Sequence, residues 1–276
     1  MKGPLYKYSI ILLTSAIFTA CATETKVSQV SKDDLRNSDK ILSHQLVNSV
    51  LWFQQSAEMV ASYHQAYKYA EMLLDNKLKT VRSRLPLAVV LDIDETVLDN
   101  SPYEAQMIEK GTSYESSSWK IWADEARAKA LPGALDFVNF AKERNVEVFY
   151  ISNRKSDVHS ATVENLKKHG FPFADDRHVI LSEGSNDKTS RREKVVETHT
   201  VLVYVGDNLT DYSELYAHRD LGMGKELVEK NKNELLHNFV ILPNPMYGEW
   251  EGAIYENNYG ISSDMKVKKK MNVLEK

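Results

Sequence analysis

The sequence has little of what several protein classes depend on. Its 276 residues include one cysteine, Cys21, so no disulfide can form within the chain and the fold must depend on its core. Lysine and arginine number 35 against 39 acids, and the net charge of -4 gives no basic surface for nucleic acid. Eleven glycines and seven prolines exclude a low-complexity chain, and no internal repeat is present. An ordinary globular composition remains.

Long hydrophobic runs are also scarce. The run "SIILLTSAIF" near the N-terminus is too short to span a bilayer as a helix. It follows Lys2 and Lys7 and leads to "FTAC", which ends at Cys21. This arrangement predicts an export signal over residues 1–21. No later stretch is both long and apolar, so we expect the remainder to be soluble.

The small residues before Cys21 resemble the processing box of bacterial lipoproteins. That resemblance implies that Cys21 is lipidated and anchors the protein in the cell envelope, because two or more acyl chains hold a protein firmly on a membrane. The residue after Cys21 is Ala22 and not an aspartate, which favours the outer membrane as the place of the anchor. The alternative is an ordinary cleaved signal with an incidental cysteine.

The rest of the chain alternates helical and strand patterns. Residues 22–40 are polar and aperiodic, which predicts a flexible tether before a folded domain over 41–276. From Ile41 to Leu74, apolar residues recur every three or four positions, which predicts one long amphipathic helix or two shorter ones. Nearly continuous apolar runs predict buried parallel strands at 87–92, 146–152, 201–207 and 239–243, with 178–181 as a further short candidate.

Helical patterns at 132–145 and 160–170 lie between these strands. Such alternation predicts an α/β fold with a doubly wound, mostly parallel sheet, and core strands from about 87 to 243. Residues 99–131 are polar, aromatic-rich and weakly patterned. We expect them to form, with the N-terminal helix, a smaller and mainly helical cap. Ligands of such sheets bind in the crevice beyond the carboxyl ends of the strands.

Polar residues stand at those carboxyl ends. The candidates that we expect to converge on the crevice are Asp92, Asp94, Ser152, Asn153, Lys188, Asp207 and Asp211. Residues two apart in an extended chain point the same way, so Asp92 and Asp94 would face together. Their repulsion would be relieved by Mg²⁺, which takes oxygen ligands and would be shared with Asp207. Taken singly, each motif also fits a solvated turn, a helix cap or a charged surface.

The strings "DIDET", "IS", "DK" and "GDNLTD", in this order, resemble the signatures of the haloacid dehalogenase-like phosphohydrolases. The longer strings "DIDETVLDNSPY", "YISNR", "DKTSRR", "VGDNLTDY" and "LPNPMYGEWEGAIYENNY" resemble the bacterial class C acid phosphatases of the lipoprotein e type. The resemblance spans nearly the whole mature chain. Tyr212 stands where that family most often has phenylalanine.

The resemblance implies a Mg²⁺-dependent acid phosphomonoesterase that works through an aspartyl phosphate. Asp92 would be the nucleophile. Asp94 would protonate the leaving oxygen and then activate water, and its backbone carbonyl would bind the metal. The remaining roles that the family implies are a third metal ligand for Asp207, an outer-shell position for Asp211, and phosphate binding for Ser152, Lys188 and, as an assistant, Asn153.

Aromatic residues suggest a substrate with a ring. In the family an aromatic residue of the "PNPMYGEW" stretch packs on a nucleotide base, and Tyr247 fits that position, with Tyr103 as a further wall candidate. Sealing of the domain edge is the alternative for these rings. We therefore expect 5′-nucleotide-like substrates, nicotinamide mononucleotide among the candidates. A sugar or metabolite phosphatase, and a non-catalytic envelope lipoprotein for ligand capture or adhesion, stay open, as does a homodimer.

Overall fold

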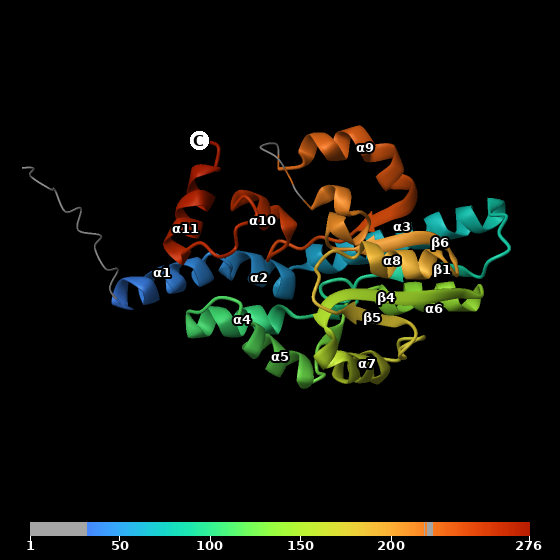
Figure 1. Ribbon diagram of the computed structural model, residues 1–276, viewed down its shortest axis with the longest axis horizontal. Coiled ribbons are helices and arrows are strands. Elements are labelled where there is room, and N and C mark those ends of the chain that lie inside the picture. Colours follow the sequence, from blue (N-terminus) through green and yellow to red (C-terminus); the bar gives the residue numbers. More distant parts are fainter. Residues whose placement is uncertain (1–31, 218, 220–222) are drawn as a thin grey trace, which may run out of the picture. The chain divides into compact units, whose positions relative to one another are not determined.

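The computed structural model describes residues 32–217, 219 and 223–276 (Figure 1). The predicted signal over 1–21 and its lipidation residue Cys21 lie outside the described residues. The predicted tether ends too late, because helix α1 (Lys32–His44) already includes its last nine positions, 32–40. Tertiary contact overrides the polar composition here: α1 packs on the C-terminal helix α11 (Ser263–Asn272), and the Ser263 hydroxyl donates to Asp39.

The core is a five-stranded sheet in which every neighbouring pair is parallel, as predicted. Its order across the sheet is β5 (Val179–Ser182), β4 (Val146–Lys155), β1 (Leu87–Leu91), β6 (Thr200–Gly206) and β7 (Phe239–Ile241). Strand β1 is central, with its successor β4 on one side and β6 on the other. The chain therefore changes direction across the sheet beside β1, which is where open α/β sheets form their ligand crevice.

Helices cover both faces of this sheet because successive strand residues point to opposite sides. On one face Val89 and Leu91 join the large core made with α3 (Ala57–Thr80), α6 (Ala134–Glu143) and α7 (His159–Lys168). On the other face Ala88 and Val90 pack with Val195 of α8 (Thr189–Val196), and α9 (Lys225–Asn238) lies against β6 and β7. Burial on both faces accounts for the nearly continuous apolar runs.

The predicted N-terminal stripe is divided between α2 (Val47–Gln55) and α3. Ser56 separates them with an extended backbone, and its side chain accepts a hydrogen bond from the Met59 amide at 3.0 Å, which caps α3. This break shifts the helical phase. Met59 is therefore buried and Val60 exposed, whereas an unbroken stripe would have buried Val60.

The cap has more parts than predicted. Strands β2 (Leu98–Asp99) and β3 (Lys129–Ala130) pair antiparallel, so the inserted segment leaves and rejoins the core at one point. Between them lie α4 (Ser101–Lys110) and α5 (Ser116–Asp124), while α1 packs on both α4 and α11. The short helix α10 (Glu249–Ile254) completes this side of the molecule. Within the described part of the chain, none of the helices combines the length and apolar character needed to cross a bilayer.

Candidate active site

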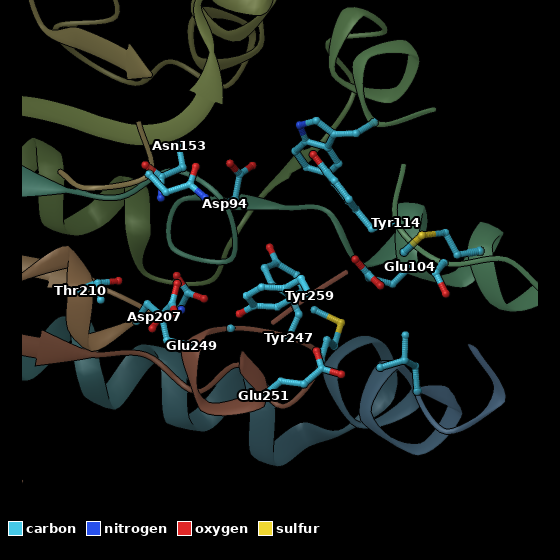
Figure 2. Close-up of a pocket in the computed structure, with 18 of the residues that line it drawn as sticks. Asp94, Glu104, Tyr114, Asn153, Asp207, Thr210, Tyr247, Glu249, Glu251 and Tyr259 are labelled. Carbon is cyan, nitrogen blue, oxygen red and sulfur yellow. The ribbon is translucent and has the colours of Figure 1, made fainter. Parts of the chain in front are cut away.

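A cavity of about 610 Å³ opens beyond the carboxyl ends of β1, β4 and β6 (Figure 2). All seven candidates predicted from the strand ends line it. They are Asp92, Asp94, Ser152, Asn153, Lys188, Asp207 and Asp211. The parallel strand order accounts for this convergence, because it brings distant strand ends to one edge of the sheet.

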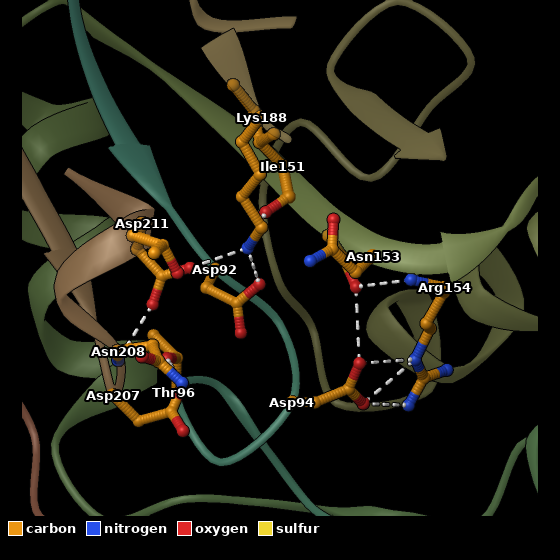
Figure 3. Close-up of polar contacts among 12 residues, drawn as sticks. Asp92, Asp94, Thr96, Ile151, Asn153, Arg154, Lys188, Asp207, Asn208 and Asp211 are labelled. Atoms are coloured by element: carbon orange, nitrogen blue, oxygen red, sulfur yellow. Dashed lines mark hydrogen bonds and ion pairs between the residues drawn. The ribbon is translucent and has the colours of Figure 1, made fainter. Parts of the chain in front are cut away.

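Asp92 is buried directly after β1, where its amide donates to the Val205 carbonyl at 3.0 Å. The Lys188 ammonium donates to the Asp92 carboxylate, to the Ile151 carbonyl at 2.9 Å and to Asp211 at 2.6 Å (Figure 3). Burial raises the pKa of Asp92 to about 7, although Lys188 opposes the shift. Burial opposes the charge of Lys188, but the two carboxylates raise its pKa overall. One cation thus links two acids from different strands.

Three acids share the floor of the cavity. One carboxylate oxygen each of Asp92, Asp207 and Asp211 lies within 4.8 Å of the others. Burial, followed by the charges of Asp211 and Asp92, raises the pKa of Asp207 well above its usual range. Among the described residues, Lys188 is the cation that forms ion pairs in this cluster, so one bound ammonium faces three acids and does not balance them fully. A hard divalent cation with oxygen ligands fits this deficit.

The hydrogen bonds separate the roles of these acids. Both Asp211 oxygens are engaged, one by Lys188 and the other by the Asn208 amide at 2.9 Å. The second oxygen of Asp92 accepts no hydrogen bond from any residue described in the structure. Asp207 accepts from the Asn244 side-chain amide at 2.8 Å, and its other oxygen has only a long contact with the Thr96 hydroxyl at 3.5 Å. Asp92 and Asp207 are therefore the acids best placed to bind a cation directly, with Asp211 behind them.

Gly206 permits this packing of Asp211. A β-carbon at Gly206 would lie 2.2 Å from an Asp211 carboxylate oxygen, which is too close for two atoms that are not bonded. The glycine of "GDNLTD" is thus needed for the close approach of the second aspartate to the end of β6. The short helix η2 (Leu209–Asp211) completes the turn.

Asp94 belongs to a different network. Its carboxylate accepts from Arg154 at 2.8 and 2.9 Å, from the Asn100 side-chain amide at 2.7 Å and from the Ser152 hydroxyl at 3.2 Å (Figure 3). Arg154 is buried and is fixed in turn by Thr162 at 3.1 Å. Sequence reasoning assigned no role to Arg154. The available signal was an arginine at the end of an apolar strand, inside "YISNR".

The basic run "KTSRR" is built into the site. Arg191 and Arg192 are both buried, which rules out the solvated surface that their charges alone also fitted. Arg191 donates to the Ser152 carbonyl and, at 2.7 Å, to the side-chain oxygen of Asn153. That bond leaves the Asn153 amide nitrogen free to donate into the cavity. Ser152 itself lies inside β4 and caps no helix.

Two tyrosines of α3 hold the loop that follows Asp92. The Tyr63 hydroxyl donates to the Glu95 carbonyl, and the Tyr67 hydroxyl donates to the Thr96 carbonyl at 2.6 Å. Glu95 has a left-handed backbone, with φ of 56°, and is fully buried. A non-glycine residue in this conformation needs support from its surroundings. The helical stripe predicted the burial of both tyrosines but not the function of their hydroxyl groups.

The side of the cavity formed by the cap is lined by aromatic rings. These are Tyr114, Trp119, Tyr247, Tyr255 and Tyr259. Tyr103, predicted as a wall residue, is not among them. It is buried behind the wall, where its ring meets that of Trp119 edge-on at 5.1 Å and its hydroxyl lies 2.9 Å from Ser118. Tyr103 therefore supports the wall that Tyr247 lines.

Comparison with known proteins is consistent with this geometry. Residues 10–250 match the family model of the HAD superfamily, subfamily IIIB (acid phosphatase). The fold is similar to that of the class C acid phosphatase from Bacillus anthracis, with a TM-score of 0.81 and 37% identity over 85% of this chain and 98% of that one. The tungstate-bound structure of the class C enzyme from that organism gives a TM-score of 0.81 and 36% identity, over 86% and 99%.

Acid phosphatase 1 of Solanum lycopersicum is a more distant relative. It is 28% identical over 166 residues, and the match covers 57% of each chain, so this chain spans little more than half the length of that protein. The family model covers most of the chain, and the Bacillus anthracis structure is matched over nearly its whole length. The family predicted from the motifs is confirmed: the chain belongs to the HAD superfamily, subfamily IIIB, the acid phosphatases.

Proposed function

We propose that the protein is a Mg²⁺-dependent acid phosphomonoesterase that hydrolyses 5′-nucleotides or related phosphomonoesters. One observation carries the proposal. One carboxylate oxygen of Asp92 faces the cavity and accepts no hydrogen bond from the described residues, while the other accepts from the buried Lys188. A second acid, Asp94, lines the same cavity and is held by separate donors. A nucleophile and an acid–base group have distinct environments, which a simple binding protein does not need.

The residues support a two-step reaction. Asp92 attacks phosphorus, the bond from phosphorus to the leaving oxygen breaks, and Asp94 gives its proton to that oxygen. Asp94 then takes a proton from water, which attacks the aspartyl phosphate and releases inorganic phosphate with Asp92 restored. The Asn153 amide nitrogen can donate to the phosphoryl oxygens directly. Lys188 and the Ser152 hydroxyl donate to the acids and to the Ile151 carbonyl in this structure, and they would exchange one of these partners for the phosphoryl group. Arg154 holds Asp94 in place during both steps.

Asp92 and Asp207 would hold the metal, with the Asp94 backbone carbonyl as the third ligand that the family implies and Asp211 in the outer shell. When bound, Mg²⁺ would neutralise the clustered acids and stabilise charge on the phosphoryl oxygens. The chain itself supplies the acids Asp92, Asp207 and Asp211, whose negative charge is not fully balanced and therefore attracts a cation.

Tyr247 supports a substrate with an aromatic ring, because it lines the cavity between the acids and the cap (Figure 2). The tungstate bound to the Bacillus anthracis enzyme is an oxyanion, like phosphate. We also retain the proposal that Cys21 carries a lipid anchor in the cell envelope. Replacement of Cys21 by serine should move the protein from the membrane fraction to the soluble fraction.

Phosphate release from nucleoside monophosphates, sugar phosphates and phenyl phosphate, with and without EDTA, tests the proposal. We expect Asp92→Asn to lose about a thousandfold or more in kcat, because the amide is a poor nucleophile. Asp136→Asn changes an exposed acid of α6 and serves as the matched control. Full activity of Asp92→Asn, or of the wild type after exhaustive EDTA treatment, would contradict the mechanism. A preference for sugar phosphates would leave the chemistry intact and change the substrate class.

A further inference from the structure

The far end of the cavity holds a buried acid that the proposed chemistry does not use. Glu104 of α4 is only 6% exposed and lines the same cavity as Asp92. Within the described part of the chain, no residue gives Glu104 a hydrogen bond or an ion pair. Its carboxyl oxygens are not among the fully enclosed polar atoms that lack a partner, so they keep contact with the water of the cavity and can offer their hydrogen bonds to a ligand there.

Glu251 of α10 lies near Glu104 and differs from it in one respect. Its carboxylate accepts from the Lys270 ammonium at 2.6 Å and from the Tyr255 hydroxyl at 2.9 Å. Figure 2 shows both glutamates at the end of the cavity opposite Asp94 and Asp207, with Tyr247 and Tyr259 between the two ends. These groups come from two parts of the sequence, α4 on one side and the consecutive segment of the loop before α10, α10 and α11 on the other.

We propose that Glu104, backed by Glu251, binds a hydrogen-bond donor on the leaving group of the substrate, such as the exocyclic amino group of a nucleobase or the carboxamide of a nicotinamide ring. This inference rests on the proposed function and defines the part of the substrate that lies farthest from the phosphate. A ring against Tyr247 would place its polar edge toward this end of the cavity.

The protonation of Glu104 is compatible with this role. Burial, followed by the charge of Glu251, raises the pKa of Glu104 to about 8, so Glu104 carries a neutral carboxyl group at acidic and neutral pH. A neutral carboxyl group both accepts and donates. It matches an edge that carries an amino donor beside a ring-nitrogen acceptor, as adenine does. When Glu104 is ionised, its carboxylate would instead bind a cationic group.

A metal is a poorer explanation for this end of the cavity. Across residues 32–217, 219 and 223–276, the acids that could together hold an ion are Asp92, Asp207 and Asp211. Glu251 is already neutralised by Lys270, and the Lys266 ammonium lies 5.7 Å from the centre of the Tyr255 ring. Positive charge is therefore already present, and what the site lacks is a donor for Glu104.

Two substrates that differ by one amino group test the inference. We expect the wild type to prefer adenosine 5′-monophosphate to purine riboside 5′-monophosphate by about fivefold in kcat/KM, which one hydrogen bond supplies. The preference should fall to about one in Glu104→Met and be retained in part in Glu104→Gln, whose amide still accepts. Glu109→Met, an exposed glutamate of the same helix, should keep the wild-type ratio.

The outcomes separate the two proposals. If the wild type hydrolyses phenyl phosphate but shows equal ratios in all variants, the Glu104 subsite is wrong and the phosphatase stands. If neither phenyl phosphate nor either nucleotide is hydrolysed, the phosphatase proposal fails. Calorimetric binding of adenosine and of purine riboside to the wild type and to Glu104→Met then decides the subsite. Tighter binding of adenosine that disappears in the variant supports it, and equal binding overturns it.

Discussion

The two ends of the cavity are built on opposite principles. At the sheet edge, Asp94 accepts from three side chains and Asp211 has a donor on each oxygen. At the cap end, Glu104 has neither a donor nor a cation beside it among the described residues. Groups that react must be held in one geometry, and a network of partners does this. Groups that recognise a ligand retain unsatisfied capacity, which the ligand then fills.

The backbone shows the same contrast. The reactive side chains stand on or beside parallel strands that a large core fixes in register. The recognition wall comes from three parts of the chain, namely α1, α4 and the C-terminal pair α10 and α11. Variation in the cap can therefore change what is bound without moving the acids of the sheet edge.

Loss of Lys188 should have the largest effect. Lys188→Met leaves Asp92 and Asp211 without their shared cation and removes a donor to the phosphoryl group, so we expect kcat to fall about a thousandfold. Steady-state phosphate release measures the loss. Lys194→Met, at an exposed lysine of α8, the helix that begins directly after Lys188, is the control. A Lys188→Met enzyme within tenfold of the wild type would show that the buried ion pairs are purely structural.

Arg154 should rank next. It acts through Asp94, so Arg154→Met should lower kcat about a hundredfold while KM changes little, because a misplaced acid–base group slows the chemistry more than binding. Arg154→Lys should recover part of kcat through a single donor. Lys155→Met, at the exposed position next to Arg154, is the matched control. A rise in KM with unchanged kcat would instead place Arg154 on the substrate.

Glu104 makes the pH dependence of the cap end testable. Its folded pKa of about 8 exceeds the ordinary value of 4.5, so the folded state holds a proton that the unfolded state has released between these values. The contribution of this proton to the free energy of unfolding should therefore be fully present below about pH 4.5 and decline as pH rises towards 8. Glu104→Gln has no proton to lose. The difference in the free energy of unfolding between the wild type and Glu104→Gln should change by about 2 kcal/mol between pH 4.5 and 8. This is less than the full pKa shift implies, because the cavity admits water.

Urea unfolding at a series of pH values measures that difference. Because both proteins share every other titrating group, only the change in the difference with pH is informative. Parallel curves for wild type and Glu104→Gln would mean that the carboxyl group is solvated and unshifted. The contrast between a satisfied end and an unsatisfied end of the cavity would then disappear.

The sheet edge was more predictable from the sequence than the cap, for a physical reason. Apolar runs place strands, and parallel strands bring their ends together, so the positions of Asp92 and Asp207 at one edge follow from local pattern and topology. Arg154 and Asn244 contribute through tertiary contacts that no local spacing encodes. The C-terminal part of the cap was missed because its helices are short and polar outside their few buried positions.

Tyr63 shows how a core residue can also serve the site, and its loss should have the smallest effect. Its ring packs in the core in an edge-on contact with Phe53, a role that phenylalanine keeps. Tyr63→Phe removes the donor to the Glu95 carbonyl, together with a longer contact to the Pro243 carbonyl at 3.4 Å, and this costs about 1 kcal/mol in stability. Activity should fall severalfold, because Glu95 shares its loop with Asp92 and Asp94.

Tyr69→Phe, on an exposed part of α3, removes a hydroxyl that bonds the Leu236 carbonyl and leaves that loop untouched. If both variants lose stability equally and neither loses activity, then the α3 tyrosines support the fold alone, and the fixed geometry of the sheet edge comes from its own strands.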